Sequence, residues 1–184
     1  MIFQVTILLT FILGLSNGKI QLRLQHTSAF QYAFRDETTD QDVNHARQTL
    51  LSEKMNPLSV SSKTLLVAYD LEEPDKIIGF GQIRPTSDKN YQELASLFVR
   101  PEYRNQGVGS ALIERLLQKF DSEPKNKHTT CCLLTLRPTI PFYSKYGFVE
   151  VTKDIPPPLK MEYKAGQLLS FLLGNDLVCM LRQK

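Results

Sequence analysis

Hydrophobic positions recur along this chain with two periods, one typical of strands and one typical of helices. Within residues 30–35 aromatic side chains occupy every second position, which predicts a half-buried strand. Apolar side chains then recur at helical spacing after Thr39 and Asp42, a pair with the spacing of a capping box. This pattern predicts a helix over residues 40–54.

The remaining elements are predicted from apolar runs and from the turn residues between them. Runs at 64–69 and 77–83 flank a turn-rich segment and predict a hairpin. Further strands are predicted at 91–99, 130–136, 148–151 and 177–181, and further helices from Val108 onward, at 141–146 and at 159–173. Because a helix separates strands 91–99 and 130–136, we expect these two to be parallel neighbours. The continuous apolar run at 130–136 also predicts a central strand that is covered on both faces. The prolines at 156–158 exclude regular structure there.

The composition indicates a globular protein but does not identify a binding partner. The chain has 184 residues, 42% hydrophobic and 22% charged, which is typical of a globular protein with one packed core. The formal net charge of +3 gives no indication of nucleic-acid binding, and none is expected. The three cysteines lack the spacing of a zinc site, so no metal is predicted. Cys131 and Cys132 would point to opposite faces of one strand and are expected as reduced thiols in the core.

The first part of the chain requires a separate explanation. Residues 1–18 contain no charged side chain, and residues 5–15 have the length of a signal-peptide core. Three interpretations of this segment remain open: a removable signal or membrane anchor, a helix or strand packed on the domain, and another kind of targeting peptide. The localisation is therefore not predicted; without a signal or anchor it would be cytoplasmic or organellar. Any membrane contact would come from this segment alone. We expect a linker at 19–29 and one domain over 30–184.

The segment between strand 91–99 and the following helix has the composition of an anion site. Two glycines within three residues let the backbone turn tightly and bring several N–H groups into one concavity at a helix N-terminus. The candidate phosphate-binding residues are Arg104, Asn105, Gln106, Gly107, Val108, Gly109 and Ser110. Arg104 would add a cation at the rim. The alternative is a glycine-containing loop that only starts a helix, and the segment is neither a Walker loop nor a dinucleotide fingerprint.

A second motif, FYSKYGF at 142–148, follows one strand later. Together with ELASLFVRPEYRNQGVGSALIERLL at 93–117, it resembles the GNAT superfamily of acetyl-CoA-dependent N-acyltransferases, over roughly residues 30–184. The resemblance implies an α/β fold with a mixed, mostly antiparallel central sheet, a splayed parallel strand pair and flanking helices. It also implies that the glycine loop holds the pyrophosphate of coenzyme A. The pantetheine arm would hydrogen-bond to the backbone of Leu97 and Val99 between the splayed strands.

The resemblance implies transfer of an acetyl group from acetyl-CoA to a primary amine by direct attack in a ternary complex. The amine must first lose a proton, and Glu93 acting through water is the candidate base. A solvated strand-end carboxylate is the alternative interpretation of Glu93. Many family members carry a glutamate on the next strand, where this chain has Thr135, which weakens the assignment of a base.

Two further groups would serve the reaction. A backbone N–H near Phe98 or Val99 would stabilise the oxyanion. Tyr143 matches the tyrosine that protonates the departing thiolate in many family members, with Tyr146 as the fallback and packing of the short helix as the alternative role. No Ser-His or Cys-His pair suggests an acyl-enzyme. The alternative function is a non-catalytic protein that binds or senses acyl-CoA, and neither the acceptor nor the oligomeric state is predicted.

Overall fold

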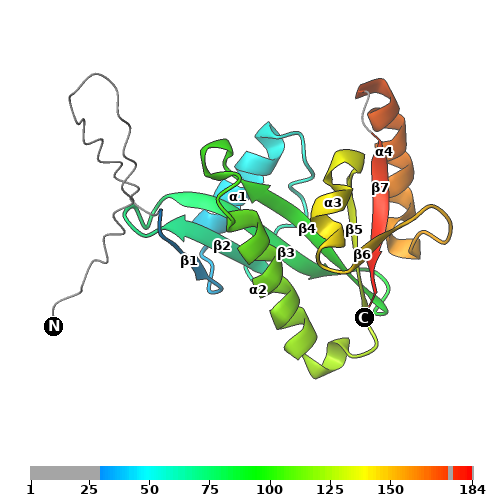
Figure 1. Cartoon of the computed structure of the whole chain (residues 1–184), viewed down its shortest axis with the longest axis horizontal. Coiled ribbons are helices and arrows are strands. Elements are labelled where there is room, and N and C mark those ends of the chain that lie inside the picture. Colours follow the sequence, from blue (N-terminus) through cyan, green and yellow to red (C-terminus); the bar gives the residue numbers. More distant parts are fainter. Residues whose placement is uncertain (1–29, 174–175, 184) are drawn as a thin grey trace, which may run out of the picture. The chain divides into compact units, whose positions relative to one another are not determined.

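The computed structural model describes residues 30–173 and 176–183, and the predicted apolar segment at 1–18 and linker at 19–29 lie outside them (Figure 1). One seven-stranded sheet has the order β1-β2-β3-β4-β5-β7-β6, in which only β4 and β5 are parallel neighbours. The predicted fold class, a mixed and mostly antiparallel α/β sheet, is confirmed. Each helix within the described ranges is too short or too polar to traverse a bilayer.

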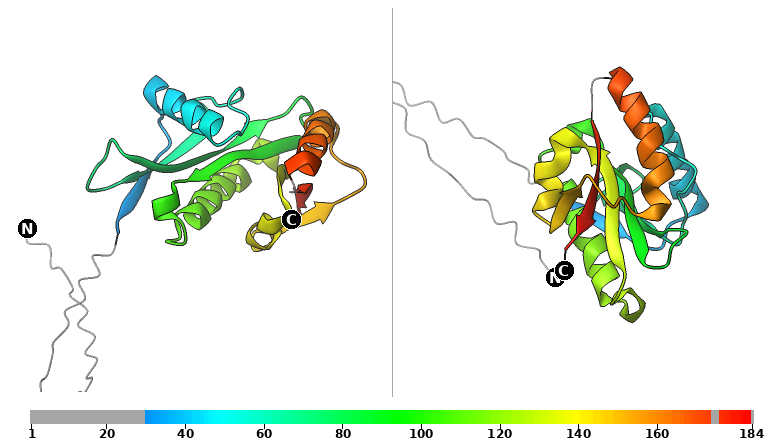
Figure 2. Two further views of the ribbon diagram at one scale, coloured as in Figure 1. Left: turned by 90° about the horizontal axis from the view of Figure 1, so that it is seen from above. Right: turned by 90° about the vertical axis from the view of Figure 1, so that its right-hand side faces the viewer.

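The predicted elements are confirmed to within two residues at each end. The strands are β1 Tyr32–Arg35, β2 Leu65–Asp70, β3 Ile77–Pro85, β4 Tyr91–Val99, β5 Thr130–Leu136, β6 Phe148–Val151 and β7 Leu177–Arg182. The α-helices are α1 Asp40–Ser52, α2 Val108–Ser122, α3 Ile140–Ser144 and α4 Lys160–Leu173. Figure 2 shows that α1 and α4 cover one face of the sheet and that α2 and α3 cover the other.

Helix α1 begins where the sequence predicts because its capping box is complete. The Asp42 carboxylate accepts from the Thr39 backbone N–H at 2.8 Å, and the Thr39 hydroxyl accepts from the Asp42 N–H at 3.2 Å. Asp42 also pairs with Arg35 at 2.8 Å, which ties the first turn of α1 to β1. Asp42 therefore serves to cap the helix.

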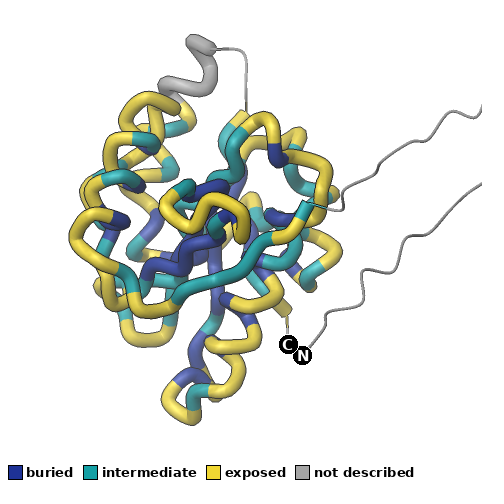
Figure 3. Tube along the Cα trace, turned by 90° about the vertical axis from the view of Figure 1, so that its left-hand side faces the viewer, coloured by how far each residue is buried: buried dark blue, intermediate teal, exposed yellow. Residues whose placement is uncertain are grey.

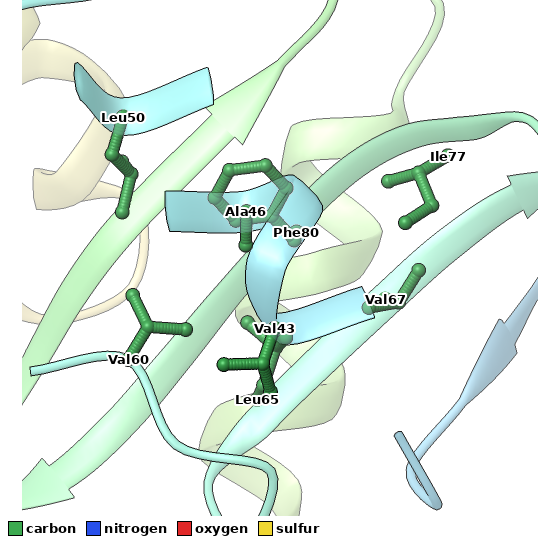
Figure 4. Packing of buried hydrophobic residues seen from close by; sticks show 8 residues of the cluster. All are labelled: Val43, Ala46, Leu50, Val60, Leu65, Val67, Ile77 and Phe80. Atoms are coloured by element: carbon green, nitrogen blue, oxygen red, sulfur yellow. The ribbon is translucent and has the colours of Figure 1, made fainter. Parts of the chain in front are cut away.

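A hydrophobic core joins α1 to the middle of the sheet. Its buried members come from α1, from the connection to β2 and from β2 and β3: Val43, Ala46, Leu50, Val60, Leu65, Val67, Ile77 and Phe80 (Figure 4). Phe98 of β4 packs against this group, with its ring centroid 5.4 Å from that of Phe80. Figure 3 shows that buried positions concentrate along the central strands. The core thus fixes the β3–β4 face on which α1 lies.

Two sequence predictions need correction. The prolines do not exclude regular structure, because Pro157–Leu159 forms a 3₁₀ turn directly before α4, with prolines at the initial positions where their lack of an N–H costs nothing. Strand β5 is central but is not covered throughout. It is buried at Cys131, Cys132 and Leu133, whereas Leu136 is 41% exposed, because β4 leaves its side partway along.

Candidate active site

The parallel strands β4 and β5 separate soon after they begin. Their register ends at the pair Glu93 and Cys132. Beyond that pair, within the described part of the chain, β4 is paired only with β3 and β5 only with β7. The backbone edge of β4 from Leu94 to Val99 therefore has no ladder partner there and can bind an extended ligand. This confirms the predicted splay, which we call the β4–β5 divergence.

Strand β4 carries a bulge inside the divergence. Phe80 of β3 lies opposite Phe98, whereas Gln82 lies opposite Ala95, so β4 holds one extra residue between these pairs. Ser96 in this bulge has a left-handed φ of 57°. A bulge bends its strand and redirects the neighbouring backbone groups. Sequence reasoning missed this feature because serine has no particular preference for the left-handed region.

The glycine loop forms the start of α2 as predicted. Gly107 is the N-cap with φ of 84°, and a Cβ placed there would meet no atom within 4 Å. A Cβ on Gly109 would lie 3.5 Å from Val99 and 3.6 Å from Phe142. The first turn of α2 therefore lies between the end of β4 and helix α3, beside the β4–β5 divergence. Its first amides have no partners within the helix and point outward.

The other predicted loop residues have unequal roles in the structure. The Arg104 Nε donates to the carbonyl of Val99 at 3.0 Å, and its side chain is exposed. The Gln106 amide donates to the carbonyl of Glu102 at 2.8 Å, which closes the loop on itself. Val108 is buried, so only its backbone can reach a ligand. Asn105 has a left-handed φ of 61°, and the loop thus combines two left-handed positions before the helix.

Tyr103 anchors this loop to the body of the sheet and was not singled out from the sequence. Its side chain is buried, and its hydroxyl donates to Asp70 of β2 at 3.2 Å. The Arg100 Nε donates to the carbonyl of Ile77 in β3 at 2.5 Å. Both contacts hold the loop in place from the sheet side. An aromatic residue just before the glycine loop could have indicated an anchor in the core. The sequence alone does not show that Asp70 is the residue to which Tyr103 bonds.

Glu93 lies at the last residue pair before the strands separate. It is buried, and one carboxylate oxygen, Oε2, accepts from Arg84 Nε at 2.9 Å and lies 2.6 Å from Arg84 Nη2. Arg84 also lies 3.6 Å from Glu162 of α4. Glu93 is therefore not the solvated strand-end carboxylate that was the alternative. Arg84 was missed, although the β3–β4 hairpin register places it directly opposite Glu93.

The environment of Glu93 makes its carboxylate more basic than that of an ordinary glutamate. Burial raises the pKa of Glu93 above its ordinary value, and the neighbouring Arg84 opposes that shift. A hollow of about 190 Å³ opens beside it, lined also by Thr86, Leu159 and Glu162. A carboxylate with a raised pKa at the edge of a hollow is suited to accept a proton through water.

Tyr143 lies on α3, on the β5 side of the divergence. Burial raises the pKa of its phenol, while a side-chain hydrogen bond with Thr135 lowers it. Thr135 in turn shares a 2.6 Å hydrogen bond with the hydroxyl of Thr139. The ring packs edge-on against Phe142 and Phe148, at centroid distances of 5.2 and 6.2 Å. Tyr143 thus both packs α3 on the sheet and keeps its hydroxyl in a polar contact.

The cysteines belong to the core, as predicted. All three are free thiols, and burial raises the pKa of Cys131 and of Cys179 to about 12. The pKa of Cys132 is also raised by burial. The thiols therefore stay protonated near neutral pH and are poor nucleophiles. Among the described residues, no group of three or more His, Cys, Asp or Glu side chains is placed to hold a metal ion.

One family profile matches part of this chain. The profile of the family described as "Acetyltransferase (GNAT) domain" matches residues 61–150, which include β2 to β5, the glycine loop and α3. No curated protein matches the chain significantly.

Many solved structures have a similar fold. N-acetylglutamate synthase of Neisseria gonorrhoeae, in complex with coenzyme A and N-acetyl-glutamate, is 12% identical, with a TM-score of 0.62 over 83% of this chain and 35% of that one. This chain thus spans about a third of that protein. Rv2747 of Mycobacterium tuberculosis, in complex with CoA, is 21% identical, with a TM-score of 0.60 over 83% of this chain and 99% of that one. An acetyltransferase of Staphylococcus aureus Mu50 is 16% identical, with a TM-score of 0.59 over 83% and 98%.

Proposed function

Since the GNAT acetyltransferase profile matches residues 61–150, we propose that the chain transfers an acetyl group from acetyl-CoA to a primary amine. The observation that carries this proposal is the β4–β5 divergence. An unpaired strand edge, a glycine-capped helix start, the half-buried Tyr143 and the buried Glu93 all lie along it. The structures of similar fold that contain coenzyme A support the same donor.

Coenzyme A would bind from the glycine loop inward. The amides that begin α2, at Gly107 to Ser110, would hold the diphosphate, because they carry partial positive charge and lack partners within the helix. Arg104, Asn105 and Gln106 would line the rim. The pantetheine arm would pair with the backbone of Leu97 and Val99, as an added strand does at an exposed edge.

The acceptor amine must be neutral before it attacks, because an ammonium group has no lone pair. Lysine-like amines have a pKa of about 10.4 and α-amino groups of about 7.7–8.0, so most acceptors arrive protonated at neutral pH. We assign Glu93 as the base that accepts this proton through water. Its position beside a hollow at the point where the strands part supports the assignment.

Acyl transfer then proceeds without an enzyme-bound intermediate. The amine nitrogen forms a bond to the thioester carbon, and the carbonyl oxygen becomes an oxyanion that a backbone N–H near Phe98 or Val99 would stabilise. The nitrogen then releases its second proton to water, and the C–S bond breaks as the amide forms. Tyr143 donates its proton to the departing thiolate, which leaves as coenzyme A thiol, and solvent restores the phenol. The protonated core thiols support direct transfer in a ternary complex.

The test is release of coenzyme A thiol from acetyl-CoA with a panel of amines: N-terminal peptides, lysine peptides, amino acids and polyamines. Thiol release that depends on the amine, together with a mass increase of one acetyl group on the acceptor, is expected. Tight binding of acetyl-CoA without transfer to any amine would instead favour a non-catalytic acyl-CoA sensor. Thr135 supports that second candidate, since many family members have a glutamate there.

A further inference from the structure

Gln82 of β3 is a fully buried polar side chain with every hydrogen-bonding group engaged. Its exposed fraction is 0%. Its amide nitrogen donates to the carbonyl of Ser59 at 3.2 Å and to the hydroxyl of Ser96 at 3.1 Å. Its amide oxygen accepts from the hydroxyl of Thr64 at 2.8 Å. None of the steps proposed above uses this side chain.

These contacts join two parts of the molecule that are distant in sequence. Ser59 and Thr64 lie in the segment that connects α1 to β2, whereas Ser96 is the left-handed residue of the β4 bulge. The connecting segment is itself fixed, because Val60 is buried in the core and its carbonyl accepts from Arg47 at 2.9 Å. Gln82 therefore ties the bulge to a rigid support.

The bulge needs such a support for a physical reason. A non-glycine residue is strained in the left-handed region, so Ser96 tends to return to an extended conformation unless neighbouring contacts hold it. On the next residue, Leu97 packs over Gly81, where an added Cβ would lie 3.1 Å from the leucine side chain. Gln82 and Gly81 thus hold the two successive bulge residues from adjacent positions of β3.

We infer that Gln82 is a positioning residue for acyl transfer: by holding Ser96, it sets the direction of the backbone amides of the bulge toward the thioester carbonyl. The inference rests on the proposed function, because it assigns the bulge amides to that carbonyl. Without the amide of Gln82, Ser96 would relax and the donors would turn away. Misplacement of reacting or stabilising groups by about 1 Å can reduce turnover by about 100-fold.

The test compares Gln82→Met, which keeps the length of the side chain without its hydrogen bonds, with Gln118→Met on the exposed face of α2. For Gln82→Met we expect kcat to fall by about 10- to 100-fold, while the affinity for coenzyme A changes less than about threefold, because most of it is expected from the diphosphate at the glycine loop and only a small part from the backbone of Leu97. Gln118→Met should match the wild type in both. Adding Ser96→Gly to Gln82→Met should restore part of the lost kcat, because glycine adopts a left-handed φ without strain.

The experiment distinguishes failure of the positioning role of Gln82 from failure of the proposed acetyl transfer. Wild-type kcat in Gln82→Met overturns the inference, and so does an equal loss of kcat and coenzyme affinity without rescue by Ser96→Gly. If the wild type transfers acetyl to no amine, the proposed function fails. Amide hydrogen exchange then tests whether Gln82 anchors the bulge. Faster exchange confined to residues 95–98 in Gln82→Met supports the anchoring of the bulge, whereas unchanged exchange there refutes it.

Discussion

Glu93 and Arg84 show how an ion pair can change the pKa of a candidate proton acceptor. Burial disfavours the carboxylate of Glu93, and the guanidinium of Arg84 restores part of its acidity. Because the pKa of Glu93 in the folded state is above its ordinary value of 4.5, its stabilising contribution is complete below about that pH. The contribution is lost as the pH rises through the raised pKa. The same ionisation creates the form that can accept a proton.

The first prediction concerns Arg84→Gln. Loss of the guanidinium should raise the pKa of Glu93 further, so the acid limb of kcat/KM should move to higher pH than in the wild type. Glu93→Gln should lower kcat/KM by about 100-fold or more and remove this limb. Steady-state rates measured with one acceptor from pH 5 to 9 provide the check. Arg115→Gln, which breaks an exposed pair with Asp36, is the matched control and should leave the limb in place.

The second prediction concerns the hydroxyl of Tyr143. Tyr143→Phe keeps the ring that packs against Phe142 and Phe148 but removes the proton donor. We expect kcat to fall by about 100-fold with coenzyme affinity retained. Because burial raises the pKa of this phenol, wild-type turnover should persist above pH 10, where an ordinary tyrosine ionises. Equal rates for Tyr143→Phe and wild type across the pH range would exclude the donor role.

At the scale of single elements, helix α2 combines two functions in one segment. Its buried stripe, with Val108, Leu112 and Leu116, packs on the sheet, whereas its glycine-capped start leaves backbone amides exposed. The helix has 15 residues, long enough for its aligned dipoles to favour an anion at the N-terminus. The end of β4 and the start of α2 therefore bring together an unpaired strand edge and the partial positive charge of the helix N-terminus.

The third prediction is a loss of coenzyme binding in Gly107→Val. A side chain there would enter the space that the diphosphate is proposed to occupy, and it would strain a φ of 84°. We expect the affinity for coenzyme A, measured by calorimetry, to fall by about 100-fold. Gly147→Ala is the control, because Gly147 has a φ of 83° but lies before β6. This substitution should lower the free energy of unfolding by about 1 kcal/mol without weakening the binding of coenzyme A.

At the scale of the whole molecule, the sheet consists of two paired groups of strands that share only a short parallel contact. Strands β1 to β4 form one antiparallel group, and β5, β7 and β6 form the other. Buried side chains and α1 support the first group, while Leu159 and Cys179 form part of a second buried cluster with Cys132. A ligand that occupies the divergence would connect the two groups.

The fourth prediction follows from that connection. Coenzyme A at 100 times its dissociation constant should stabilise the folded chain by about 2.7 kcal/mol and raise Tm by about 5–10 °C. Amide hydrogen exchange should slow in both β4 and β5. Pantetheine, which lacks the diphosphate, should produce a much smaller shift at the same concentration. Protection of only one of the two strands would contradict binding across the divergence.

Local sequence determined the elements because each depends on contacts between near neighbours. The capping box of Thr39 and Asp42, the apolar stripe of α2 and the glycine at position 107 act within a few residues, so their patterns are visible in the chain. The two motifs at 93–117 and 142–148 also led to the family and to the splayed pair. The candidate roles of Glu93 and Tyr143 came from the same motifs and stay predictions.

Tertiary structure alone decided which partners those residues have. The strand register places Arg84 opposite Glu93, and Thr135 of β5 bonds to Tyr143 of α3. Gln82 bonds to Ser96 because β4 has a bulge that no residue type in the sequence indicates. Such contacts join residues far apart in the chain, and their formation depends on how strands align and where a backbone bends. A one-residue change of register would exchange these partners without altering the hydrophobic pattern that predicts the strands.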